Sequence, residues 1–448
     1  MRKIHFIGIG GIGVSALAKY YLKKGWQVSG SDLSFSEITD DLKNQGARIS
    51  VGKHKAKSLS KDTDLVIYSP AVSKNNLELV AAKRFGIKYL SYPQALGQLT
   101  REYYTIAVSG THGKSTTTAM IGLLLKEAKL DPTVIVGTKV REFNNFTPHL
   151  PTSRDGAGSN CRMGESKYLV IEADEWQASF LNYSPKIIIL TNIEREHLDY
   201  YKNLSHILNT YRKYLRRLSK EGILIANKDD KNVYKLAKEN KKLKVIFYSL
   251  KQKETGKVKK VLKIPGTHNA SNALAVLAVA KVLNISDRVF LKALSKYKGT
   301  WRRFEEKKAI IGNKKITIIS DYAHHPTEIK ATLAAVKEKF RKRKIFAIFQ
   351  PHQYQRTFFL FDEFVKSFNL ADEVILTNIF DVVGRETEKI SKKVSAQELA
   401  DNIKKQGKNC HFIANFRKIP QFIKKRLKSN DIVLIMGAGD IYKLYEQF

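Results

Sequence analysis

Cysteine is scarce in this chain, with Cys161 and Cys410 the two representatives among 448 residues. Two thiols so far apart exclude a disulfide framework and favour a reducing compartment. No run of 18 or more apolar residues is present, which argues against a membrane-spanning helix. The chain starts in a predicted strand rather than in a signal peptide. We therefore expect a cytoplasmic protein without membrane insertion.

Acidic residues are also in short supply, because 42 Asp and Glu stand against 79 Lys and Arg, a formal net charge of +37. Such a charge is typical of proteins that bind nucleic acid or anionic membranes. Here the lysines are spread over the whole length, and no basic cluster interleaved with aromatic residues is present. We interpret them as solvated helix faces and expect no nucleic-acid partner. A nucleic-acid-binding ATPase stays an alternative on charge alone.

The length and the hydrophobic content of 43% are enough for about three domains with real cores. Strand patterns alternate with helical patterns along the chain, which is typical of parallel α/β sheets. We predict a Rossmann-like N-terminal domain, a central P-loop ATPase-type domain with a mostly parallel sheet, and a Rossmann-like C-terminal domain, at 1–98, 99–298 and 299–448. Residues 141–166 are rich in Asn, Pro, Ser and Gly and are predicted to form a long functional loop.

A phosphate-binding loop in the middle of the chain is the strongest chemical signal. An apolar strand at 103–109 runs into Gly-Thr-His-Gly-Lys-Ser at 110–115. The two glycines let backbone N–H groups surround phosphate oxygens. Lys114 can reach the outer phosphates, and the Ser115 hydroxyl can ligate magnesium. The match is to the shorter Gly-x-x-Gly-Lys-Ser form, since Val108 stands where the full pattern has glycine. The loop predicts a protein that uses ATP.

A second glycine-rich turn opens the chain. Gly-Ile-Gly-Gly-Ile-Gly at 8–13 follows a strand and opens a helix, and Asp32 closes the next strand. This spacing fits the dinucleotide fingerprint, so an NAD-dependent oxidoreductase is an alternative. The fingerprint guarantees only a pyrophosphate at a helix N-terminus, however, and a UDP-sugar satisfies it equally. One ATP site together with one diphosphate site favours a ligase over a dehydrogenase.

Polar residues at strand ends supply candidate metal and base contacts. Glu172 ends a buried strand of the ATP-binding domain, where a magnesium ligand belongs. His197 follows the next strand and is a candidate ligand for a second metal. Asn269 and Asn272 lie three residues apart at the start of an apolar helix, a spacing that suits amide contacts to adenine.

The last third of the chain carries a cationic cluster. Arg303 lies at the predicted second domain junction, where an arginine can swing onto a γ-phosphate when domains close. The segments 321–326 and 350–357 each follow a predicted strand. The basic residues of these segments are His324, His325, His352 and Arg356. They would gather at one edge of the sheet, where they could bind the carboxylate of an amino acid. The glycine turn at 437–439 is interpreted as a packing turn.

Together these residues resemble the Mur ligase family of peptidoglycan synthesis over essentially the whole chain. The resemblance is carried by the segments 5–13, 110–115, 172–175, 321–328 and 349–357. The last segment is the most discriminating. The related ligases that recycle murein tripeptides share the histidine pair but typically lack its Gln-Pro-His-x-Tyr-x-Arg-Thr pattern.

The resemblance implies an ATP-dependent ligase that joins L-alanine to the carboxylate of UDP-N-acetylmuramate through an acyl phosphate. ATP and Mg²⁺ would be the cofactors, and the protein would be a monomer or a weak dimer. A ligase that attaches a tripeptide to the same sugar acid is the alternative within the family.

The resemblance also implies a role for each matching position. The UDP-substrate would be bound by Gly8, Gly10, Gly11, Gly13, Asp32 and Ser69. ATP would be bound by Gly110, Thr111, His112, Gly113, Lys114, Ser115, Thr116, Asn269, Asn272, Arg303 and Asp321, the last at the ribose. The incoming amino acid would be framed by Tyr322, His324, His352 and Arg356. Magnesium would be held by Ser115, Glu172 and His197. The catalytic residues would be Lys114, His197, Arg303, His324 and His325, and either histidine of the 324–325 pair could take the proton of the amine.

Overall fold

The structure is a computed structural model that describes residues 1–143, 158–382 and 388–448. Two compact units make up the chain. The first contains 1–193, 208–261 and 272–297, and the second contains 194–207, 262–271 and 298–448.

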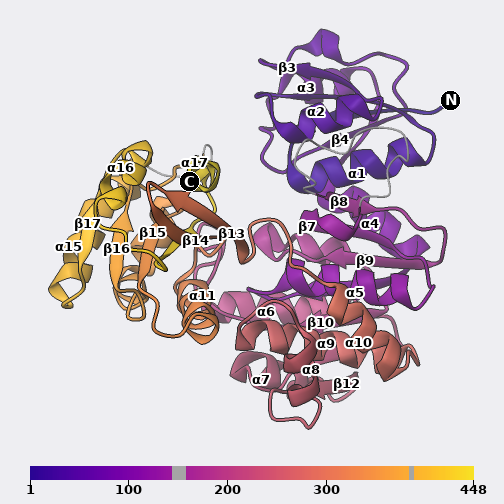
Figure 1. Cartoon of the computed structure of the whole chain (residues 1–448). Helices are drawn as coiled ribbons and strands as arrows, with labels where there is room; N and C mark the ends of the chain where they lie inside the picture. The colour runs from indigo at the N-terminus through magenta and orange to yellow at the C-terminus, as the bar shows by residue number, and fades with distance from the viewer. Residues whose placement is uncertain (144–157, 383–387) are drawn as a thin grey trace. The chain divides into compact units, whose positions relative to one another are not determined.

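A five-stranded, fully parallel sheet begins the first unit, with the strand order β3-β2-β1-β4-β5 (Figure 1). The strands are β1 Lys3–Ile7, β2 Gln27–Asp32, β3 Arg48–Val51, β4 Leu65–Tyr68 and β5 Lys88–Ser91. The connections hold α1 Ile12–Lys23, α2 Glu37–Asn44, η1 Ala56–Ser58 and α3 Leu77–Arg84, and α4 Tyr92–Glu102 follows β5. The chain leaves β1 toward β2 on one side and later returns to β4 on the other. The end of β1 is therefore a topological switch point, where ligands of open α/β sheets bind.

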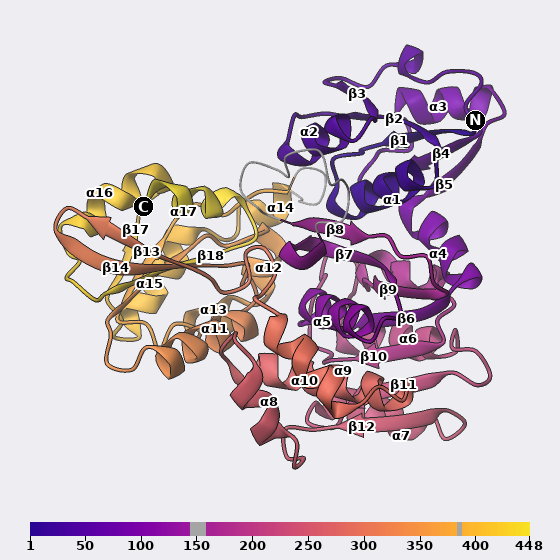
Figure 2. The same cartoon turned by 45° about the vertical axis from the view of Figure 1, so that its right-hand side comes forward.

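A seven-stranded sheet forms the rest of the first unit, in the order β12-β11-β10-β6-β9-β7-β8 (Figure 2). Its strands are β6 Tyr104–Ser109, β7 Thr133–Val140, β8 Ser159–Arg162, β9 Tyr168–Glu172, β10 Ile187–Leu190, β11 Ile223–Asn227 and β12 Lys244–Tyr248. The associated helices are α5 Lys114–Glu127, η2 Arg141–Phe143, η3 Trp176–Asn182, α6 Leu204–Leu215, α7 Lys231–Glu239, α8 Thr255–Val261, α9 Thr267–Val282 and α10 Asp287–Lys296. Strand β6 is central and lies between β10 and β9, so the phosphate loop that follows it emerges in the middle of the sheet.

The second unit is built on a six-stranded sheet in the order β13-β14-β18-β15-β16-β17. The strands are β13 Glu305–Ile311, β14 Lys314–Asp321, β15 Ile345–Phe349, β16 Glu373–Leu376, β17 Cys410–Phe412 and β18 Ile432–Met436. The helices are α11 Pro326–Lys339, α12 Tyr354–Phe359, α13 Phe361–Val365, α14 Glu388–Ser391, α15 Ala396–Lys405, η4 Phe416–Lys418, α16 Ile419–Lys424, η5 Asp440–Lys443 and α17 Leu444–Gln447. Apolar cores cover both faces of this sheet, as a mainly parallel sheet requires.

The predicted α/β class is confirmed, but two hairpin-like pairings were not foreseen. Strand β8 pairs antiparallel with β7, and β13 pairs antiparallel with β14. The expectation that 141–166 is one long loop is therefore wrong at its end, because β8 lies within it. Its sequence Ser-Asn-Cys-Arg has no apolar run, and the hydrogen bonds to β7 alone make it a strand. Residues 144–157 of that segment lie outside the described residues.

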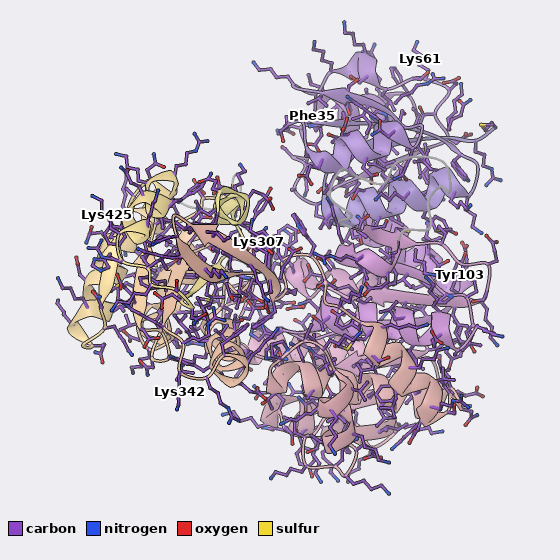
Figure 3. The ribbon with its side chains drawn as sticks, viewed as in Figure 1. Phe35, Lys61, Tyr103, Lys307, Lys342 and Lys425 are labelled. Carbon is purple, nitrogen blue, oxygen red and sulfur yellow. The ribbon has the colours of Figure 1, made fainter. Side chains whose placement is uncertain are left out.

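The basic excess is distributed over the surface of both units. Lys61 in the first unit and Lys342 and Lys425 in the second are exposed and point outward (Figure 3). Within the described ranges, none of the helices combines the length and the apolar character needed to traverse a bilayer. The side chains thus fit the interpretation of solvated lysines.

Gly97 marks a close backbone contact between α4 and η3. A Cβ atom built on it would lie 2.5 Å from the carbonyl oxygen of Asn182. We expect Gly97→Ala to lower the free energy of unfolding by about 1–3 kcal/mol, since the backbone must shift. Gly256 in α8 is the matched control, because a Cβ there meets nothing within 4 Å. Gly256→Ala should be neutral or stabilising by up to about 1 kcal/mol. Urea titrations in which the two variants behave alike would contradict the contact.

Candidate active site

The turn after β1 is shaped by Asp32 at the end of β2. The backbone N–H of Gly10 donates to Asp32 Oδ2 at 2.8 Å, and a Cβ on Gly10 would lie 2.9 Å from that oxygen. The N-cap of α1 is Gly11, which makes no side-chain capping bond. The positive end of the helix is thus presented to the turn, as a diphosphate requires. The predicted roles of Gly8, Gly13 and Ser69 toward the UDP group stay predictions; Ser69 packs beside Gly8.

The phosphate loop can be built only with glycine at two positions. Gly110 and Gly113 have φ angles of +129° and +83°, in the region that favours glycine. A Cβ on Gly110 would lie 2.1 Å from Thr191 Oγ1, and one on Gly113 would lie 2.5 Å from Asn272 Oδ1. Asn272 therefore lies against the phosphate loop.

Asn192, to which the sequence analysis gave no role, fixes the loop from the neighbouring strand end. Its Oδ1 accepts the backbone N–H of His112 at 2.8 Å, and its own carbonyl accepts that of Thr111 at 2.9 Å. The Thr191 hydroxyl donates to the His112 carbonyl at 2.6 Å. These bonds hold the loop in one conformation. Predicting them requires knowing that β10 and β6 are neighbours.

Lys114 is held at the base of the loop by a carboxylate that the sequence analysis did not single out. Its Nζ donates to the Gly110 carbonyl at 2.7 Å and pairs with Glu175 Oε2 at 2.9 Å, and the two side chains are 12% and 3% exposed. Burial alone would lower the pKa of Lys114. Glu175, Asp174 and Glu172 together outweigh it and raise that pKa above its ordinary value. Lys114 is therefore a fixed cation, as phosphate binding needs.

Ser115 and Glu172 form an oxygen-rich pair at the start of α5. The Ser115 hydroxyl lies 3.0 Å from both carboxylate oxygens of Glu172, whose Oε2 also accepts the N–H of Gly137 at 2.8 Å. A hydroxyl and a carboxylate are ligands that Mg²⁺ prefers. The donor set therefore fits the magnesium site predicted from the sequence. Thr116, next along the helix, is buried.

The two asparagines at the start of α9 have separate surroundings. The Asn269 amide donates to the Pro265 carbonyl at 2.7 Å, which secures the first turn of the helix. Asn272, as described above, packs against Gly113. Their contact with adenine stays a prediction.

In the second unit, the adjacent arginines before β13 differ in their surroundings. Arg302 is buried, and its Nη2 donates to the carbonyls of Gly437 and Gly439 at 2.5 and 3.1 Å. The glycine turn at 437–439 is thus tied to the protein's own arginine. Arg303 is 28% exposed and pairs with Glu328 at 3.4 Å. Arg303 is thus the more accessible of the two, and its contact with the γ-phosphate stays a prediction.

Asp321, the last residue of β14, is directed at the protein backbone. Its carboxylate accepts the N–H groups of Phe304 and Ala323 at 2.8 and 2.9 Å and the Thr332 hydroxyl at 3.2 Å. Burial raises its pKa above the usual aspartate value. It thereby ties the segment before β13 to the turn after β14, and its contact with the ATP ribose stays a prediction.

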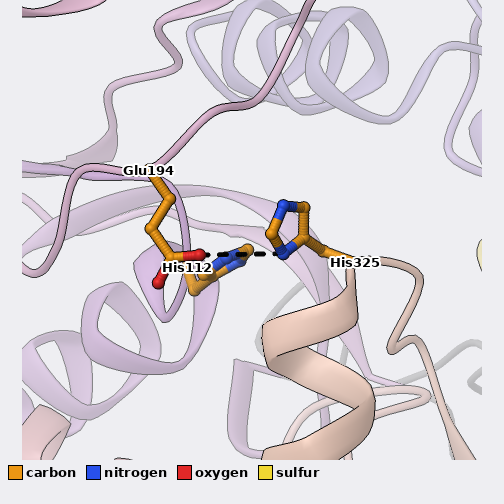
Figure 4. A group of neighbouring side chains, drawn as sticks. All are labelled: His112, Glu194 and His325. Atoms are coloured by element: carbon orange, nitrogen blue, oxygen red, sulfur yellow. Dashed lines mark ion pairs between the residues drawn. The ribbon is translucent and has the colours of Figure 1, made fainter. Parts of the chain in front are cut away.

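His325 is the N-cap of α11, and its hydrogen bonds define its tautomer. Its Nδ1 accepts the Thr327 N–H at 3.2 Å, so the proton sits on Nε2, which donates to the Arg195 carbonyl at 3.2 Å. Glu194 Oε2 lies 3.8 Å from Nδ1 (Figure 4). Both ring nitrogens thus serve the fold.

His324 has the opposite arrangement. Its Nδ1 lies 3.0 Å from the Tyr322 carbonyl and 3.1 Å from Glu328 Oε2, two acceptors, so this nitrogen carries the proton. The basic nitrogen is therefore Nε2. Burial lowers the pKa of His324 to about 4, and the ring is neutral at physiological pH. The rings of Tyr322 and His352 lie edge-on to it, with centroids at 5.2 and 5.9 Å.

Arg356 makes a buried ion pair. Its Nε and Nη2 donate to Glu196 Oε1 at 3.0 and 2.5 Å, and Nη1 donates to the His352 carbonyl at 2.9 Å. Burial would raise the pKa of Glu196, but the Arg356 charge and three histidines hold it well below its usual range. The His352 ring stacks on Phe380, with centroids 5.5 Å apart. The sequence did not reveal Glu196 as a partner of Arg356.

Three domain models of one family match this chain. They are the Mur ligase family catalytic domain at 3–104, the Mur ligase middle domain at 108–280 and the Mur ligase glutamate ligase domain at 302–439. The chain belongs to the Mur ligase family. This membership decides against the oxidoreductase interpretation of the first glycine turn.

Individual relatives are similar over their full length. The UDP-N-acetylmuramate–L-alanine ligase of Clostridium tetani is 40% identical over 471 aligned residues, which cover 100% of this chain and 98% of the relative. The crystal structure of the UDP-N-acetylmuramate–alanine ligase MurC from Thermotoga maritima is 30% identical, with a TM-score of 0.80 over 100% of this chain and 98% of that one. A murein peptide ligase from Psychrobacter arcticus shares the fold at 23% identity and a TM-score of 0.70, over 100% and 98% of the two chains.

The depressed pKa of His324 gives the unfolding free energy a defined pH dependence. An unfolded histidine gains its proton near pH 6.5, whereas the folded one stays neutral until about pH 4. Stability is therefore lost as the pH falls between these values, by about 2–3 kcal/mol at about 1.4 kcal/mol per pH unit. In His324→Asn, denaturant titrations from pH 7 to 4 should give a shallower decline. A decline parallel to that of the unmodified protein would show that this ring is not buried as described.

Proposed function

We propose that this chain is a UDP-N-acetylmuramate–L-alanine ligase, which joins L-alanine to the carboxylate of UDP-N-acetylmuramate at the expense of ATP. The observation that carries the proposal is the phosphate loop with its fixed Lys114 cation and its Ser115–Glu172 oxygen pair. A second glycine turn suited to a diphosphate and the identity to alanine ligases over the full length support it.

The chemistry requires activation of a poor acyl donor. The muramoyl carboxylate attacks the γ-phosphorus of ATP, which forms an acyl phosphate and releases ADP. The alanine amine then attacks the carbonyl carbon, and phosphate leaves with the C–O electron pair. Lys114 would neutralise the charge that spreads over the transferred phosphoryl group, and Arg303, the more exposed arginine of its pair, would add a second cation.

Ser115, Glu172 and His197 would hold Mg²⁺. When bound, the ion would supply positive charge that lowers the repulsion between the anionic substrates. The oxygens of Ser115 and Glu172 are hard ligands that fit this ion. His197 would add a nitrogen ligand.

His324 is the better candidate of the histidine pair for the proton of the amine. The attacking amine must be neutral, and a proton acceptor needs an unprotonated ring nitrogen. The bonds of His325 place its proton on Nε2 and use both nitrogens in the fold. The bonds of His324 leave Nε2 as the basic nitrogen. Its pKa of about 4 keeps this nitrogen unprotonated, and it also makes the ring a weak base.

The remaining assignments are carried over as proposals. Tyr322 and His352 would frame the alanine, and the turn with Asp32 would bind the UDP group. Asn269, Asn272 and Asp321 would contact the adenosine. The substrates are small molecules, and a cytoplasmic location and a monomeric or weakly dimeric state are expected.

Lys114→Ala is expected to lower ATP-dependent product formation by at least about 10²–10³-fold, because a transition-state cation is removed. Binding of UDP-N-acetylmuramate, measured by calorimetry, should persist. Lys126→Ala is the matched control, since Lys126 is an exposed lysine of the same helix and should leave turnover unchanged. Near-normal turnover in the Lys114 variant would defeat the scheme.

The acceptor decides between the two ligase types. We expect phosphate release from ATP in the presence of UDP-N-acetylmuramate to depend on free L-alanine. Free serine and glycine test its selectivity. Release that depends on a tripeptide such as L-alanyl-γ-D-glutamyl-diaminopimelate, and not on alanine, would instead assign the murein peptide ligase activity.

A further inference from the structure

The hairpin of β7 and β8 holds the start of α1 and the carboxylate of Glu172 on one frame within the first unit. On β8, the buried Asn160 amide donates to the Ile12 carbonyl at 2.6 Å and to Ser15 Oγ at 2.8 Å, both in the first turn of α1. On β7, the N–H of Gly137 donates to Glu172 Oε2 at 2.8 Å. The glycine turn of the first sheet and the candidate magnesium ligand are therefore fixed by two paired strands.

Tyr92, the first residue of α4, lies against the same turn of α1. A Cβ atom built on Gly13 would lie 2.7 Å from Cζ and 2.9 Å from the hydroxyl oxygen of Tyr92. The ring thus fills the space in which another residue at position 13 would have its side chain. Gly13 is the second residue of α1, and the first N–H groups of a helix have no partner within it. The phenol end is therefore beside the N–H groups that would hold the diphosphate.

The backbone at Tyr92 is well restrained. Ser91 precedes it as the N-cap of α4, and the Ser91 N–H donates to Gln94 Oε1 at 2.9 Å. Pro93 follows it in the first helical turn, where a proline fits the helix. Helix α4 leads from β5 of the first sheet to β6 of the second, the strand that precedes the phosphate loop (Figure 2). Tyr92 thus extends from a fixed point on the segment that joins the two sheets.

The hydroxyl of Tyr92 is available to a ligand. Among the described residues, none is hydrogen-bonded to it, and the side chain is partly exposed. Burial raises the pKa of Tyr92 above its ordinary value, and the negative charges of Glu172 and Asp174 raise it further. The phenol therefore keeps its proton at physiological pH and can donate it in a hydrogen bond. The effect of these two charges also indicates that the ring lies toward the candidate magnesium site.

The proposed reaction restricts where the substrate lies. Its diphosphate would be bound at the start of α1, and its carboxylate must reach the ATP phosphate and the metal beside Ser115 and Glu172. Tyr92 contacts the first of these places and lies toward the second. The sugar and its acid side chain would therefore pass along the phenol.

We propose that Tyr92 contacts the UDP-linked sugar acid between its diphosphate and its carboxylate, and that the hydroxyl donates a hydrogen bond to this part of the substrate. The inference rests on the proposed function, which supplies the substrate and its direction. It adds a residue outside the glycine turn to the UDP-substrate site. Such a residue distinguishes the sugar acid from UDP itself, because UDP ends before the contact.

The test compares two ligands that share the uridine diphosphate. Tyr92→Phe removes the hydroxyl and keeps the ring against Gly13. Tyr89→Phe is the matched control, because Tyr89 lies on β5 of the same sheet and is 40% exposed. Calorimetry on the full chain gives the Kd of UDP and of UDP-N-acetylmuramate, with Mg²⁺ and a non-hydrolysable ATP analogue present. The KM values of UDP-N-acetylmuramate, ATP and alanine are measured in turnover.

We expect Tyr92→Phe to weaken the binding of UDP-N-acetylmuramate about tenfold, the effect of losing one hydrogen bond, and to raise its KM to a similar extent. The Kd of UDP and the KM values of ATP and alanine should stay within about twofold. The Tyr89 control should match the unmodified protein. Phenylalanine fills the same space and leaves no polar group without a partner, so thermal unfolding of the variant should be unchanged.

A loss of affinity for UDP as large as that for the sugar acid would overturn the proposal, because the hydroxyl would then serve the diphosphate or the turn. Unchanged affinity for both ligands would overturn it too. If the unmodified protein bound neither ligand, the proposed function would fail and this inference with it. If it bound both but released no alanine-dependent phosphate, only the proposed function would fail, because the binding measurement needs no acceptor.

Discussion

The buried ammonium of Lys114 and the carboxylates around it form the interaction on which the nucleotide site depends. A lysine in a protein interior tends to lose its proton, because burial penalises the charged form. Glu175 contacts it directly, and Asp174 and Glu172 add to the field, so the cation persists. The same nitrogen also bonds the Gly110 carbonyl, which ties the charge to the loop backbone. A phosphate-binding loop is thereby assembled with its positive charge already in place.

The second unit repeats this use of buried charge to shape backbone. Arg302 bonds the carbonyls of a glycine turn, Asp321 bonds two N–H groups, and Glu196 bonds the N–H of His197. The partners of Arg302 and Asp321 are mostly backbone atoms of other segments, whereas Glu196 joins the backbone of its own loop to the Arg356 side chain. Arg303, in contrast, is partly exposed, and His324 is neutral. In each adjacent pair, one residue is thus occupied by bonds within the fold and the other is more available to a ligand.

Much of the architecture could be predicted from the sequence because its central strands are continuous apolar runs, such as Ile187–Leu190 and Ile345–Phe349. The edge strands β8 and β13 could not be predicted in this way. β8 has no apolar run, and β13 begins with four charged residues, so each is a strand because a neighbour offers hydrogen bonds. Glu175 and Asn192 were missed for a similar reason. Their partners in the phosphate loop are 61 and 80 residues away, and only the order of strands in the sheet brings them together.

The sequence alone was enough to predict two glycine turns suited to phosphate and the use of ATP. A phosphate is recognised by consecutive backbone N–H groups at the start of a helix. A motif of a few neighbouring residues is therefore enough to predict such a phosphate-binding loop. The tertiary structure alone decided which histidine of the 324–325 pair keeps a basic nitrogen, which of Arg302 and Arg303 is accessible, and what Arg356 holds. Those roles depend on single hydrogen bonds to Arg195, Gly437 and Glu196, which lie 130, 135 and 160 residues away along the chain. Short sequence motifs cannot predict contacts between residues that are so far apart in the chain.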